Sequence, residues 1–416
     1  MAIIERADQV PQLLQPVILG ADIAAYSLAR AFHEAYGLTS VALSQADIKF
    51  TSSSRFIDHR TVPGIESEQT LLATLHAVAE EFAGRKQLLV LGCGDWYIRA
   101  FSQHKAELEA AGYIVPYIDF DLLDRITLKD EFYADCELLG VDYPKTWVYD
   151  CADPSVRIPV DDFTYPLAAK PSNTARYHYA KFPGKKKAFI VQTPDELATI
   201  FANIQASTYD KQLIVQDFIP GGDDNMRVLT CYCDENSDVT MAAYGRVLLE
   251  DHGIMAIGNP IVIINERNDA VVAAAAKLLK HWGYRGFANF DVKFDPRDGS
   301  YRFFEVNTRL GRSNYYVTGA GVNVVTWIVD DLVLHHAHTG PMVVADQEHL
   351  FSTIPAYVIR GSVGDAEQVG RAVRLMRTHR WSNPLWYARD CARQHLWAGA
   401  YFLNRIPKYW RERRQG

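Results

Sequence analysis

GFANFDVKFDPRDGSYRFFEVNTRLGRSNYYVTGAGVN, residues 286–323, is the stretch that decides the fold of this 416-residue chain. Residues 287–294 are rich in aromatic and β-branched side chains, which favour strands. Residues 295–299 combine Asp, Pro and Gly, which favour a turn, and residues 301–306 return as a second strand. The stretch therefore predicts a β-hairpin.

Alternation along the two predicted strands sorts their side chains into two faces. The apolar face, which we expect to be buried, carries Phe290, Val292, Phe294, Phe304 and Val306. The other face carries Asn289, Asp291, Lys293, Glu305, Asn307 and Arg309. One face thus packs against the protein, and the other presents polar and charged groups.

The polar face has the composition of a site for a cation and a phosphate group. Carboxylate and amide oxygens are the ligands that Mg²⁺ prefers, so Asp291, Glu305 and Asn307 are candidate metal ligands. Lys293 and Arg309 are candidate catalytic residues, because a nearby cation stabilises the charge on a transferring phosphoryl group. The alternative is a hairpin with one solvated polar face.

Composition places the chain among globular proteins of the cytoplasm. Its 416 residues, 48 % of them hydrophobic, can fill two or three cores. A net charge of −7 gives no global attraction to nucleic acid. The six cysteines are scattered, so we expect reduced thiols, and neither a signal peptide nor a membrane span is predicted.

The N-terminal part is predicted to be a parallel α/β domain. Residues 16–43 have the pattern strand, helix, strand; residues 69–83 favour a helix and residues 88–91 another strand. Gly20 and the segment 92–95 follow two of these strands, without the glycine fingerprint of a dinucleotide site. Ligands bind at the carboxyl ends of the strands in parallel α/β sheets, so we expect part of the binding site for the acceptor substrate at these two turns.

Lys170 is a candidate nucleotide ligand in the middle of the chain. Lys129 opens a predicted helix, a position at which a lysine can simply be solvated. Lys170 ends the apolar strand 166–170, from which it can reach a phosphate or an adenine nitrogen; the alternative is a lysine at a sheet edge. The basic segment 172–187 is predicted to close over a triphosphate as a lid.

Arg246 is a further candidate catalytic residue. The segment 244–246 is predicted to end a strand, from which Arg246 can bind an acyl phosphate or a carboxylate. A surface ion pair with Glu250 is the alternative. Helices are predicted at 270–282 and 324–335.

The C-terminal segment interleaves aromatic and basic side chains from Trp381 onward. It follows a predicted strand at 350–360. Its composition fits a weak contact with a membrane surface, or equally a C-terminal helix docked on the protein. The histidines upstream are interpreted as a polar helix end rather than as a metal site; they are His335, His336 and His338.

Several of these residues, in this order, resemble the ATP-grasp enzymes. The resemblance covers residues 120–335 and rests on Lys170, Gln216, Asp217, Phe218, Ile219, Asp291, Glu305, Asn307 and Arg309. It implies an α/β fold in which two α+β subdomains grip ATP, preceded by a parallel α/β domain. The implied domains are residues 1–120, 121–340 and 341–416, the last completing the fold.

The resemblance also implies roles for individual residues. The implied ATP ligands are Lys129, Lys170, Gln216, Asp217, Phe218, Ile219 and Asp224. The implied ligands of one or two Mg²⁺ ions, with Mn²⁺ as an alternative, are Asp291, Glu305 and Asn307. The implied catalytic residues are Arg309, Arg246 and Lys293. Residues 172–187 contain only Gly184, which departs from the glycine-rich loop of many members.

A narrower resemblance lies around the second strand of the hairpin. Residues 303–309 (FFEVNTR), 311–314 (GRSN) and 316–319 (YVTG) resemble the D-aspartate ligases of Gram-positive bacteria. That family activates the β-carboxylate of D-aspartate with ATP and joins it to the stem-peptide lysine of a peptidoglycan nucleotide precursor. The resemblance implies a small-molecule carboxylate donor and an amine acceptor, with Arg312 and Ser313 as candidates for holding a substrate carboxylate.

Two other hypotheses are consistent with the same residues. One is an ATP-grasp amino-acid or peptide ligase with a different donor or acceptor. The other is a nucleotide-binding protein that no longer turns over, against which the complete set of candidate metal ligands argues. The sequence leaves open the stereochemistry of the donor, the general base for the amine and the oligomeric state.

Overall fold

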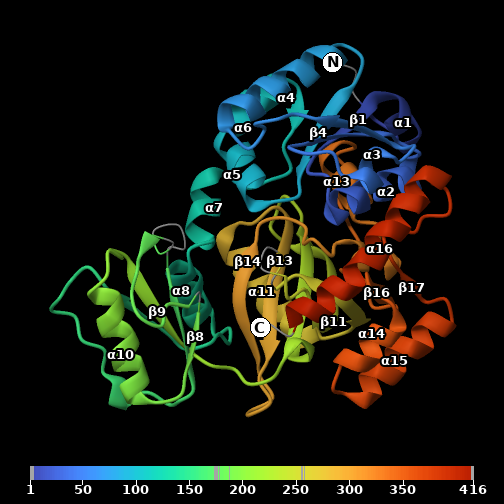
Figure 1. Ribbon diagram of the computed structural model, residues 1–416. Coiled ribbons are helices and arrows are strands. Elements are labelled where there is room, and N and C mark those ends of the chain that lie inside the picture. The colour runs from blue at the N-terminus through green and yellow to red at the C-terminus, as the bar shows by residue number, and fades with distance from the viewer. Residues whose placement is uncertain are drawn as a thin grey trace. The chain divides into compact units, whose positions relative to one another are not determined.

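The computed structural model describes residues 4–413 except 173–176, 178, 187, 254, 255 and 257 (Figure 1). The chain forms two compact units. Unit 1 contains Met1–Leu128, Gly222–Val292 and Glu305–Gly416. Unit 2 contains Lys129–Gly221 and Lys293–Phe304.

The first sheet of unit 1 is parallel and has the strand order β3-β2-β1-β4-β5. Its strands are β1 (Leu14–Leu19), β2 (Ser40–Ser44), β3 (Ile57–Thr61), β4 (Gln87–Gly92) and β5 (Tyr113–Ile114). The helices of this part are α1 (Val10–Leu13), α2 (Ile23–Tyr36), α3 (Lys49–Ser52), α4 (Glu68–Phe82), α5 (Asp95–Gln103), α6 (Lys105–Ala110) and α7 (Phe120–Ile126), with the 3₁₀ turn η1 (Ala7–Gln9). The predicted parallel α/β domain is confirmed, including its βαβ opening.

Strands β1 and β4 are neighbours, and a helix begins directly after each of them. After β1, the Asp22 carboxylate caps α2 by accepting hydrogen bonds from the N–H groups of Ala24 and Ala25. Gly20 has a φ of 129°, and a Cβ atom on it would lie 3.0 Å from Cβ of Cys93. Glycine is therefore needed at Gly20, because the turns after β1 and β4 approach each other closely there.

The second sheet of unit 1 has the order β14-β13-β10-β11-β12-β16-β17, with β15 paired to β11. Its strands are β10 (Met226–Cys233), β11 (Val239–Glu250), β12 (Pro260–Glu266), β13 (Gly286–Phe294), β14 (Tyr301–Asn307), β15 (Val343–Val344), β16 (Leu350–Ser352) and β17 (Trp381–Ser382). The remaining elements of unit 1 are η3 (Asp223–Asn225), α11 (Asp269–Trp282), α12 (Tyr315–Gly319), α13 (Val324–Leu332), α14 (Ala356–Ser362), α15 (Ala366–Arg377) and α16 (Ala392–Arg413). Strands β13 and β14 confirm the predicted hairpin.

Unit 2 contains an antiparallel sheet of order β6-β9-β7-β8. Its elements are α8 (Lys129–Leu139), β6 (Thr146–Asp150), η2 (Val160–Asp162), β7 (Leu167–Pro171), β8 (Phe189–Val191), α10 (Pro194–Gln205) and β9 (Gln212–Asp217). Helix α10 packs its buried face into a core with Leu167, Val191 and Leu213 from the sheet. Thr193 caps α10, as its spacing from Glu196 predicts.

Two predicted segments differ from the structure in their secondary structure. Residues 350–360 form a strand only as far as Ser352, after which Pro355 caps helix α14. Residues 244–246 do not end a strand but lie in the middle of β11. Gly245 is required there because a Cβ atom on it would lie 2.5 Å from Cγ2 of Ile263 on the neighbouring strand β12.

The predicted faces of the hairpin are only partly correct: on the first strand Phe294 is only partly buried, and Asn289, expected on the polar face, is 4 % exposed. Phe290 and Val292 are fully buried, but on β14 it is Phe303 that is buried, whereas Phe304 is only partly covered. The Phe303 N–H donates to the Asp142 carbonyl at 2.8 Å. The segment that follows α8 therefore pairs with the free edge of β14, which lies at the end of its sheet.

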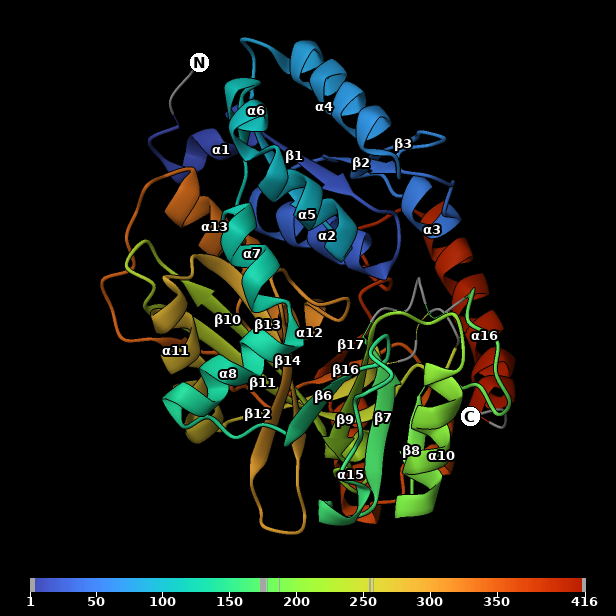
Figure 2. The same ribbon diagram turned by 90° about the vertical axis from the view of Figure 1, so that its left-hand side faces the viewer.

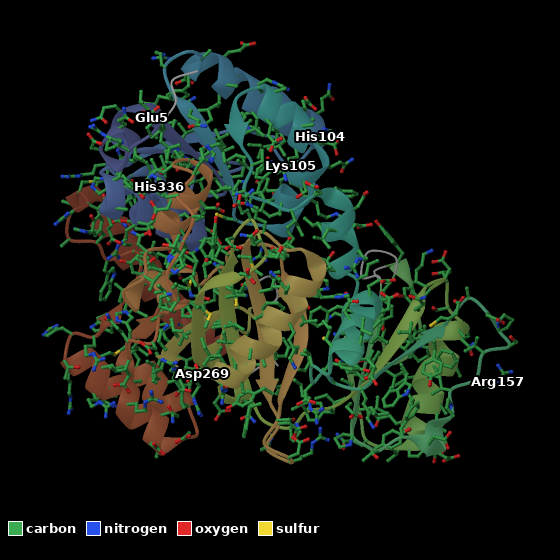
Figure 3. All side chains as sticks on the ribbon, turned by 180° about the vertical axis from the view of Figure 1, so that it is seen from behind. Glu5, His104, Lys105, Arg157, Asp269 and His336 are labelled. Atoms are coloured by element: carbon green, nitrogen blue, oxygen red, sulfur yellow. The ribbon has the colours of Figure 1, made fainter. Side chains whose placement is uncertain are left out.

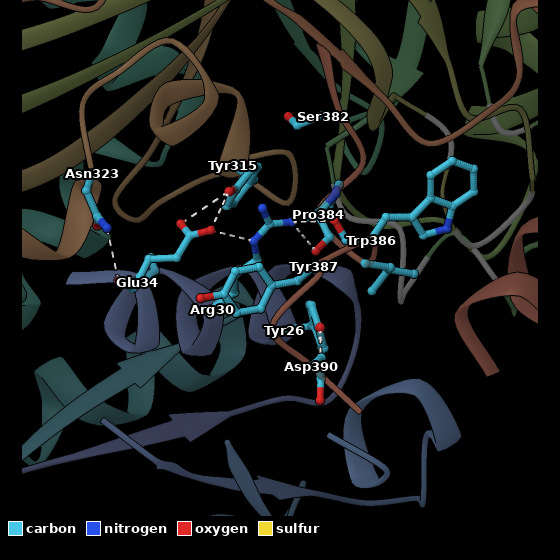
Figure 4. A network of polar contacts seen from close by, with 12 residues as sticks. Tyr26, Arg30, Glu34, Tyr315, Asn323, Ser382, Pro384, Trp386, Tyr387 and Asp390 are labelled. Atoms are coloured by element: carbon cyan, nitrogen blue, oxygen red, sulfur yellow. Dashed lines mark hydrogen bonds and ion pairs between the residues drawn. The ribbon is translucent and has the colours of Figure 1, made fainter. Parts of the chain in front are cut away.

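The C-terminal segment is anchored in unit 1 by a buried polar network (Figure 4). The Arg30 guanidinium on α2 lies over the rings of Tyr315 and Tyr387, and its Nη1 donates to the Pro384 carbonyl at 2.8 Å. The Tyr26 hydroxyl donates to the Asp390 carboxylate at 2.8 Å. Helix α16 then runs beside α3 (Figure 2), which agrees with the docked-helix interpretation of the tail.

Two further properties follow from the described part of the chain. All six cysteines are free thiols, as the sequence predicts. None of the described helices combines the length and the apolar character that a membrane-crossing helix requires.

Candidate active site

Two carboxylates lie side by side at the base of the β13–β14 hairpin in unit 1. Burial, the charge of the Glu305 carboxylate and a hydrogen bond to it raise the pKa of Asp291 well above its usual range. The Asn307 amide Nδ2 donates to the Asp291 carboxylate at 3.3 Å. The structure thus brings together all three candidate metal ligands from two neighbouring strands.

These three side chains have the chemistry of a divalent-cation site. Two adjacent carboxylates repel each other, and a cation between them removes that repulsion. Within the described part of the chain no group of three His, Cys, Asp or Glu side chains could hold a metal. A cation at Asp291 and Glu305 therefore needs the Asn307 amide oxygen and further oxygen ligands from phosphate or water, which is the coordination that Mg²⁺ favours.

Arg309 lies next to these carboxylates and is held by an acid that the sequence did not identify as its partner. Its Nε and Nη2 donate to the Asp95 carboxylate at 2.7 and 3.2 Å, and its Nη2 lies 3.5 Å from Asn307 Oδ1. Burial opposes the charge of Arg309, but Asp95 and Asp291 outweigh it and raise the pKa of the guanidinium. Arg309 is therefore a fixed cation beside the carboxylate pair.

A second ion pair between an arginine and an aspartate lies three residues further along the chain. Arg312 Nε donates to the Asp22 carboxylate at 2.9 Å. Asp95 follows β4 and Asp22 follows β1, so the two neighbouring strand ends each supply an acid to an arginine after the hairpin. The sequence places both acids at the expected sheet edge, but the pairing with arginines 214 and 290 residues away leaves no local signal.

Arg246 takes part in an ion-pair network on the second sheet. Its Nε donates to both Glu266 oxygens, at 3.2 and 3.3 Å, and Glu266 also binds Arg371. Arg371 in turn binds Glu348 at 3.0 Å. The salt-bridge partner of Arg246 is thus across the β11–β12 ladder, rather than Glu250 on its own strand.

In unit 2, the segment 216–219 at the end of β9 carries four of the candidate ATP ligands, and we call it the hinge segment. The Gln216 side chain is 3 % exposed, and its Nε2 donates to the Tyr133 hydroxyl at 2.9 Å and to Thr146 Oγ1 at 2.8 Å. These bonds use both amide N–H groups of Gln216 to join β9 to α8 and β6. Asp217 is half-buried, and this burial raises the pKa of its carboxyl.

Lys293 lies with this hinge segment. Its Nζ donates to the Gly221 carbonyl at 3.0 Å and lies 5.7 Å from the centroid of the Phe218 ring. The Ile219 side chain, in the same segment, is buried. The structure therefore groups Lys293 with candidate ATP ligands of unit 2.

The other candidate nucleotide residues occupy three positions. Lys129 is the first residue of α8, and Lys170 is a half-buried residue of β7 paired with Ile214 on β9. Asp224 lies in η3, where its neighbour Asp223 accepts from the Glu250 N–H and from His252 at 2.9 Å. Part of the predicted lid, including Arg176 and Lys187, lies outside the described residues.

A cavity of about 510 Å³ in unit 1 contains none of the predicted site residues. Its wall includes Asp330, Asp331 and the loop after α13 with His336, which is labelled in Figure 3. The predicted polar helix end is therefore a loop, because α13 already ends at Leu332. The Tyr232 hydroxyl and Arg285 both donate to Asp331, so this acid is neutralised within the protein.

Comparison with known sequences identifies relatives over the whole chain. A D-aspartate ligase from Enterococcus faecium (strain Aus0004) is 35 % identical over 403 residues, which cover 95 % of this chain and 95 % of that protein. Residues 180–329 match the family described as carbamoyl-phosphate synthase L chain, ATP binding domain. This family match begins after Lys170. It includes the candidate ATP ligands from Gln216 to Asp224 and both strands of the hairpin.

Comparison with solved structures gives the fold. The L-amino acid ligase from Bacillus licheniformis aligns with a TM-score of 0.54 and 14 % identity over 77 % of this chain and 74 % of that chain. The biotin carboxylase domain of the 2-oxoglutarate carboxylase from Hydrogenobacter thermophilus, crystallised with magnesium ADP, ADP and bicarbonate, aligns with a TM-score of 0.57 and 14 % identity over 81 % and 73 %. The mixed α/β architecture with its N-terminal parallel sheet is shared with these proteins.

Proposed function

This chain belongs to the D-aspartate ligase family of ATP-dependent ligases with the ATP-grasp fold, and we propose that it joins the β-carboxylate of D-aspartate to an amine. The observation that carries the proposal is the group at the base of the hairpin. Two adjacent carboxylates and an amide lie beside an arginine that Asp95 holds in place. This is the combination of charges that a phosphoryl transfer needs.

The donor set fits Mg²⁺, with Mn²⁺ as an alternative ion. We assign Asp291, Glu305 and Asn307 as its ligands, because their side chains lie together and the two acids repel each other without a cation. When bound, Mg²⁺ neutralises charge on the phosphate oxygens of ATP. Lys170 and Lys129 are assigned to the nucleotide phosphates, and the chain from Asp217 to Ile219, with Lys293, to the adenine.

The reaction proceeds in two displacements. An oxygen of the donor carboxylate attacks the γ-phosphorus of ATP, the bond to the β-phosphate oxygen breaks, and ADP leaves. The amine nitrogen then attacks the acyl carbon, the bond to the phosphate oxygen breaks, and phosphate and a proton leave. Arg309 stabilises negative charge in both displacements, and Asp95 keeps its guanidinium in one orientation. The acceptor amine is assigned to the lysine of a peptidoglycan stem peptide in a nucleotide precursor.

The proposal is tested by trapping the activated donor. Purified protein is incubated with ATP, Mg²⁺ and hydroxylamine, with D-aspartate or L-aspartate in separate reactions, and ADP and hydroxamate are measured. We expect hydroxamate with D-aspartate, and amide formation when a lysine-containing precursor replaces hydroxylamine. Hydroxamate with another carboxylate only would overturn the donor, and ADP release without any dependence on a carboxylate would overturn the ligase reaction.

A further inference from the structure

Helix α16 carries large apolar side chains on two opposite sides. On its inner side Ala398 and Tyr409 pack into unit 1 and are 0 and 2 % exposed. On its outer side Leu396, Trp397 and Leu403 are 69, 38 and 66 % exposed. No other helix in the described part of the chain has more than one exposed large hydrophobic side chain. The outer side of α16 therefore differs from that of an ordinary surface helix, which is polar.

The exposed apolar side chains of α16 form one continuous stripe. Leu396, Ala400, Leu403 and Pro407 follow one another at intervals of three or four residues, and all four are exposed. At 3.6 residues per turn this spacing places them on one face of the helix, which Trp397 borders. The face is about 17 Å long, at about 1.5 Å per residue. We call these five residues the exposed stripe.

Three exposed arginines accompany the exposed stripe. Arg389 precedes α16, and Arg393 and Arg411 lie one turn before and one turn after the stripe. None of the three has a hydrogen bond or an ion pair with a described residue. Residues 391–411 contain no aspartate or glutamate. The surface around the stripe is therefore positive, although the whole chain has a net charge of −7.

An apolar stripe between exposed cations is complementary to the surface of an anionic membrane. Leucine and tryptophan side chains enter the boundary between lipid headgroups and acyl chains, and arginines bind the lipid phosphates. A second copy of this chain fits less well, because a two-fold dimer through this face would bring the arginines of one chain against those of the other. The charge around the stripe thus favours a lipid surface over a self-interface.

We propose that the exposed stripe of α16 binds the surface of an anionic lipid membrane, with Arg389, Arg393 and Arg411 at the headgroups. The inner side of α16 stays packed in unit 1, so the protein contacts one face of the membrane without unfolding. Three large apolar side chains and three arginines make this a reversible contact that weakens as the salt concentration rises. The proposal is independent of the ligase reaction, because it concerns where the protein is held rather than what it catalyses.

Co-sedimentation with vesicles tests the proposal. The full chain is mixed with vesicles of phosphatidylcholine, either alone or with about one third of the anionic lipid phosphatidylglycerol. We expect binding to the anionic vesicles only, with a bound fraction that falls as NaCl is added. Leu403→Glu should lower the partition coefficient about tenfold or more, because it removes an apolar side chain and adds a negative charge. Arg393→Gln should lower it about fivefold.

Helix α8 offers a matched control. Leu138→Glu makes the same substitution at a leucine that is 68 % exposed and should leave the partition coefficient unchanged. Circular dichroism verifies the fold of each variant, and analytical ultracentrifugation without vesicles gives its oligomeric state.

The outcomes decide between the possible partners of the exposed stripe. A loss of vesicle binding in Leu403→Glu that is absent in Leu138→Glu supports the membrane surface. Equal partition coefficients for these two variants, or no binding of the wild-type protein to anionic vesicles, would overturn it. A wild-type oligomer that does not bind vesicles and that Leu403→Glu dissociates would show that the stripe is an interface between copies of the chain.

Discussion

The two ends of the β13–β14 hairpin use the same residue types in opposite ways. At the tip, Asp295 is 1 % exposed, Arg297 donates to both of its oxygens, and Arg302 lies 4.0 Å away. The hydrogen bonds from Arg297 lower the pKa of Asp295. At the base, burial and the adjacent Glu305 raise the pKa of Asp291.

This contrast separates a structural ion pair from the proposed cation site. The acid at the tip has its cations within a few residues, so its charge is balanced as soon as the chain folds. The acids at the base face each other, so the folded protein carries an electrostatic cost that a bound cation removes. Proteins retain such a cost at sites where a ligand binds.

Removing a carboxylate at the base should have the largest effect. Glu305→Gln keeps the shape of the side chain but removes one negative charge from the proposed cation site, and we expect turnover to fall by about 10³-fold or more. ADP release with ATP, Mg²⁺ and donor measures this, with circular dichroism to verify the fold. Asp298→Asn, an acid at the tip that is 49 % exposed, is the control and should keep its turnover. Wild-type turnover in Glu305→Gln would remove the metal assignment.

Removing an acid at the tip should affect stability instead. Asp295→Asn leaves Arg297 and Arg302 without their buried counter-ion, and we expect a loss of about 1–3 kcal/mol, reduced from the value for a fully buried pair because Arg297 is 47 % exposed. The free energy of unfolding from urea titrations measures the loss, and turnover at saturating substrate should stay within about twofold of wild type. If Asp295→Asn and Asp298→Asn were equally stable, Asp295 would not be the stabilising counter-ion that distinguishes the tip of the hairpin from its base.

Adding Mg²⁺ should raise the stability of the folded protein by a smaller amount, through binding at the base of the hairpin. A cation that binds only the folded base stabilises it by mass action, so the melting temperature should rise by about 2–5 °C at a Mg²⁺ concentration far above its Kd. Glu305→Gln should show no such rise, whereas Asp295→Asn should show the full one. NaCl at equal ionic strength controls for screening. An equal rise in Glu305→Gln would place the cation elsewhere.

The last comparison concerns pH, and the two ends should respond in opposite directions. The pKa of Asp291 is raised in the folded protein, so its contribution to stability is present below its ordinary pKa of 3.8 and is lost as the pH rises through the folded value. The pKa of Asp295 is lowered, so its contribution is present above 3.8 and is lost as the pH falls through the folded value.

The pH experiment compares the unfolding free energy of metal-free wild type and Glu305→Gln between pH 4 and pH 7. We expect the wild type to lose up to about 1.4 kcal/mol per pH unit relative to the variant in this window, because the variant lacks the second carboxylate. The curve of Asp295→Asn should run parallel to that of the wild type here, at lower stability, and the difference between the two should shrink only at lower pH. Parallel curves for wild type and Glu305→Gln would show that the two acids do not interact.

The parts of the fold that the sequence predicted are those with a short-range signal. The hairpin, the βαβ opening, helix α11 and the capped helix α10 each follow from periodicity, turn residues or a cap within one element. The strand predicted at 350–360 was wrong beyond Ser352 because Pro355 begins a helix. The segment 244–246 was predicted to end a strand. Glycine is present at position 245 because Ile263 of the neighbouring strand approaches it closely, which no local pattern reveals.

The candidate site shows the same limit. The members of the carboxylate pair, Asp291 and Glu305, lie on adjacent strands, so alternation along a hairpin was enough to place them together. Asp95 and Asp22 were expected at the right sheet edge, but their arginine partners lie 214 and 290 residues away. Long-range pairing depends on the assembled fold, and the position of α16 beside Arg312 could be seen only in three dimensions.

The contacts of Arg30 also determine when the N-terminal part of the protein can finish folding during synthesis. The carbonyl groups that accept from its guanidinium begin 353 residues later in the chain, and at ribosomal speeds they emerge about 20–70 s after α2. The hydrophobic core under the first sheet likewise combines Tyr26 and Phe32 with Leu385 and Ala398. The N-terminal part of the nascent chain therefore lacks part of its hydrophobic core. The core is completed only when the last residues have been synthesised and pack against it. A chain released early would expose that interior and be a substrate for chaperones rather than a smaller stable domain.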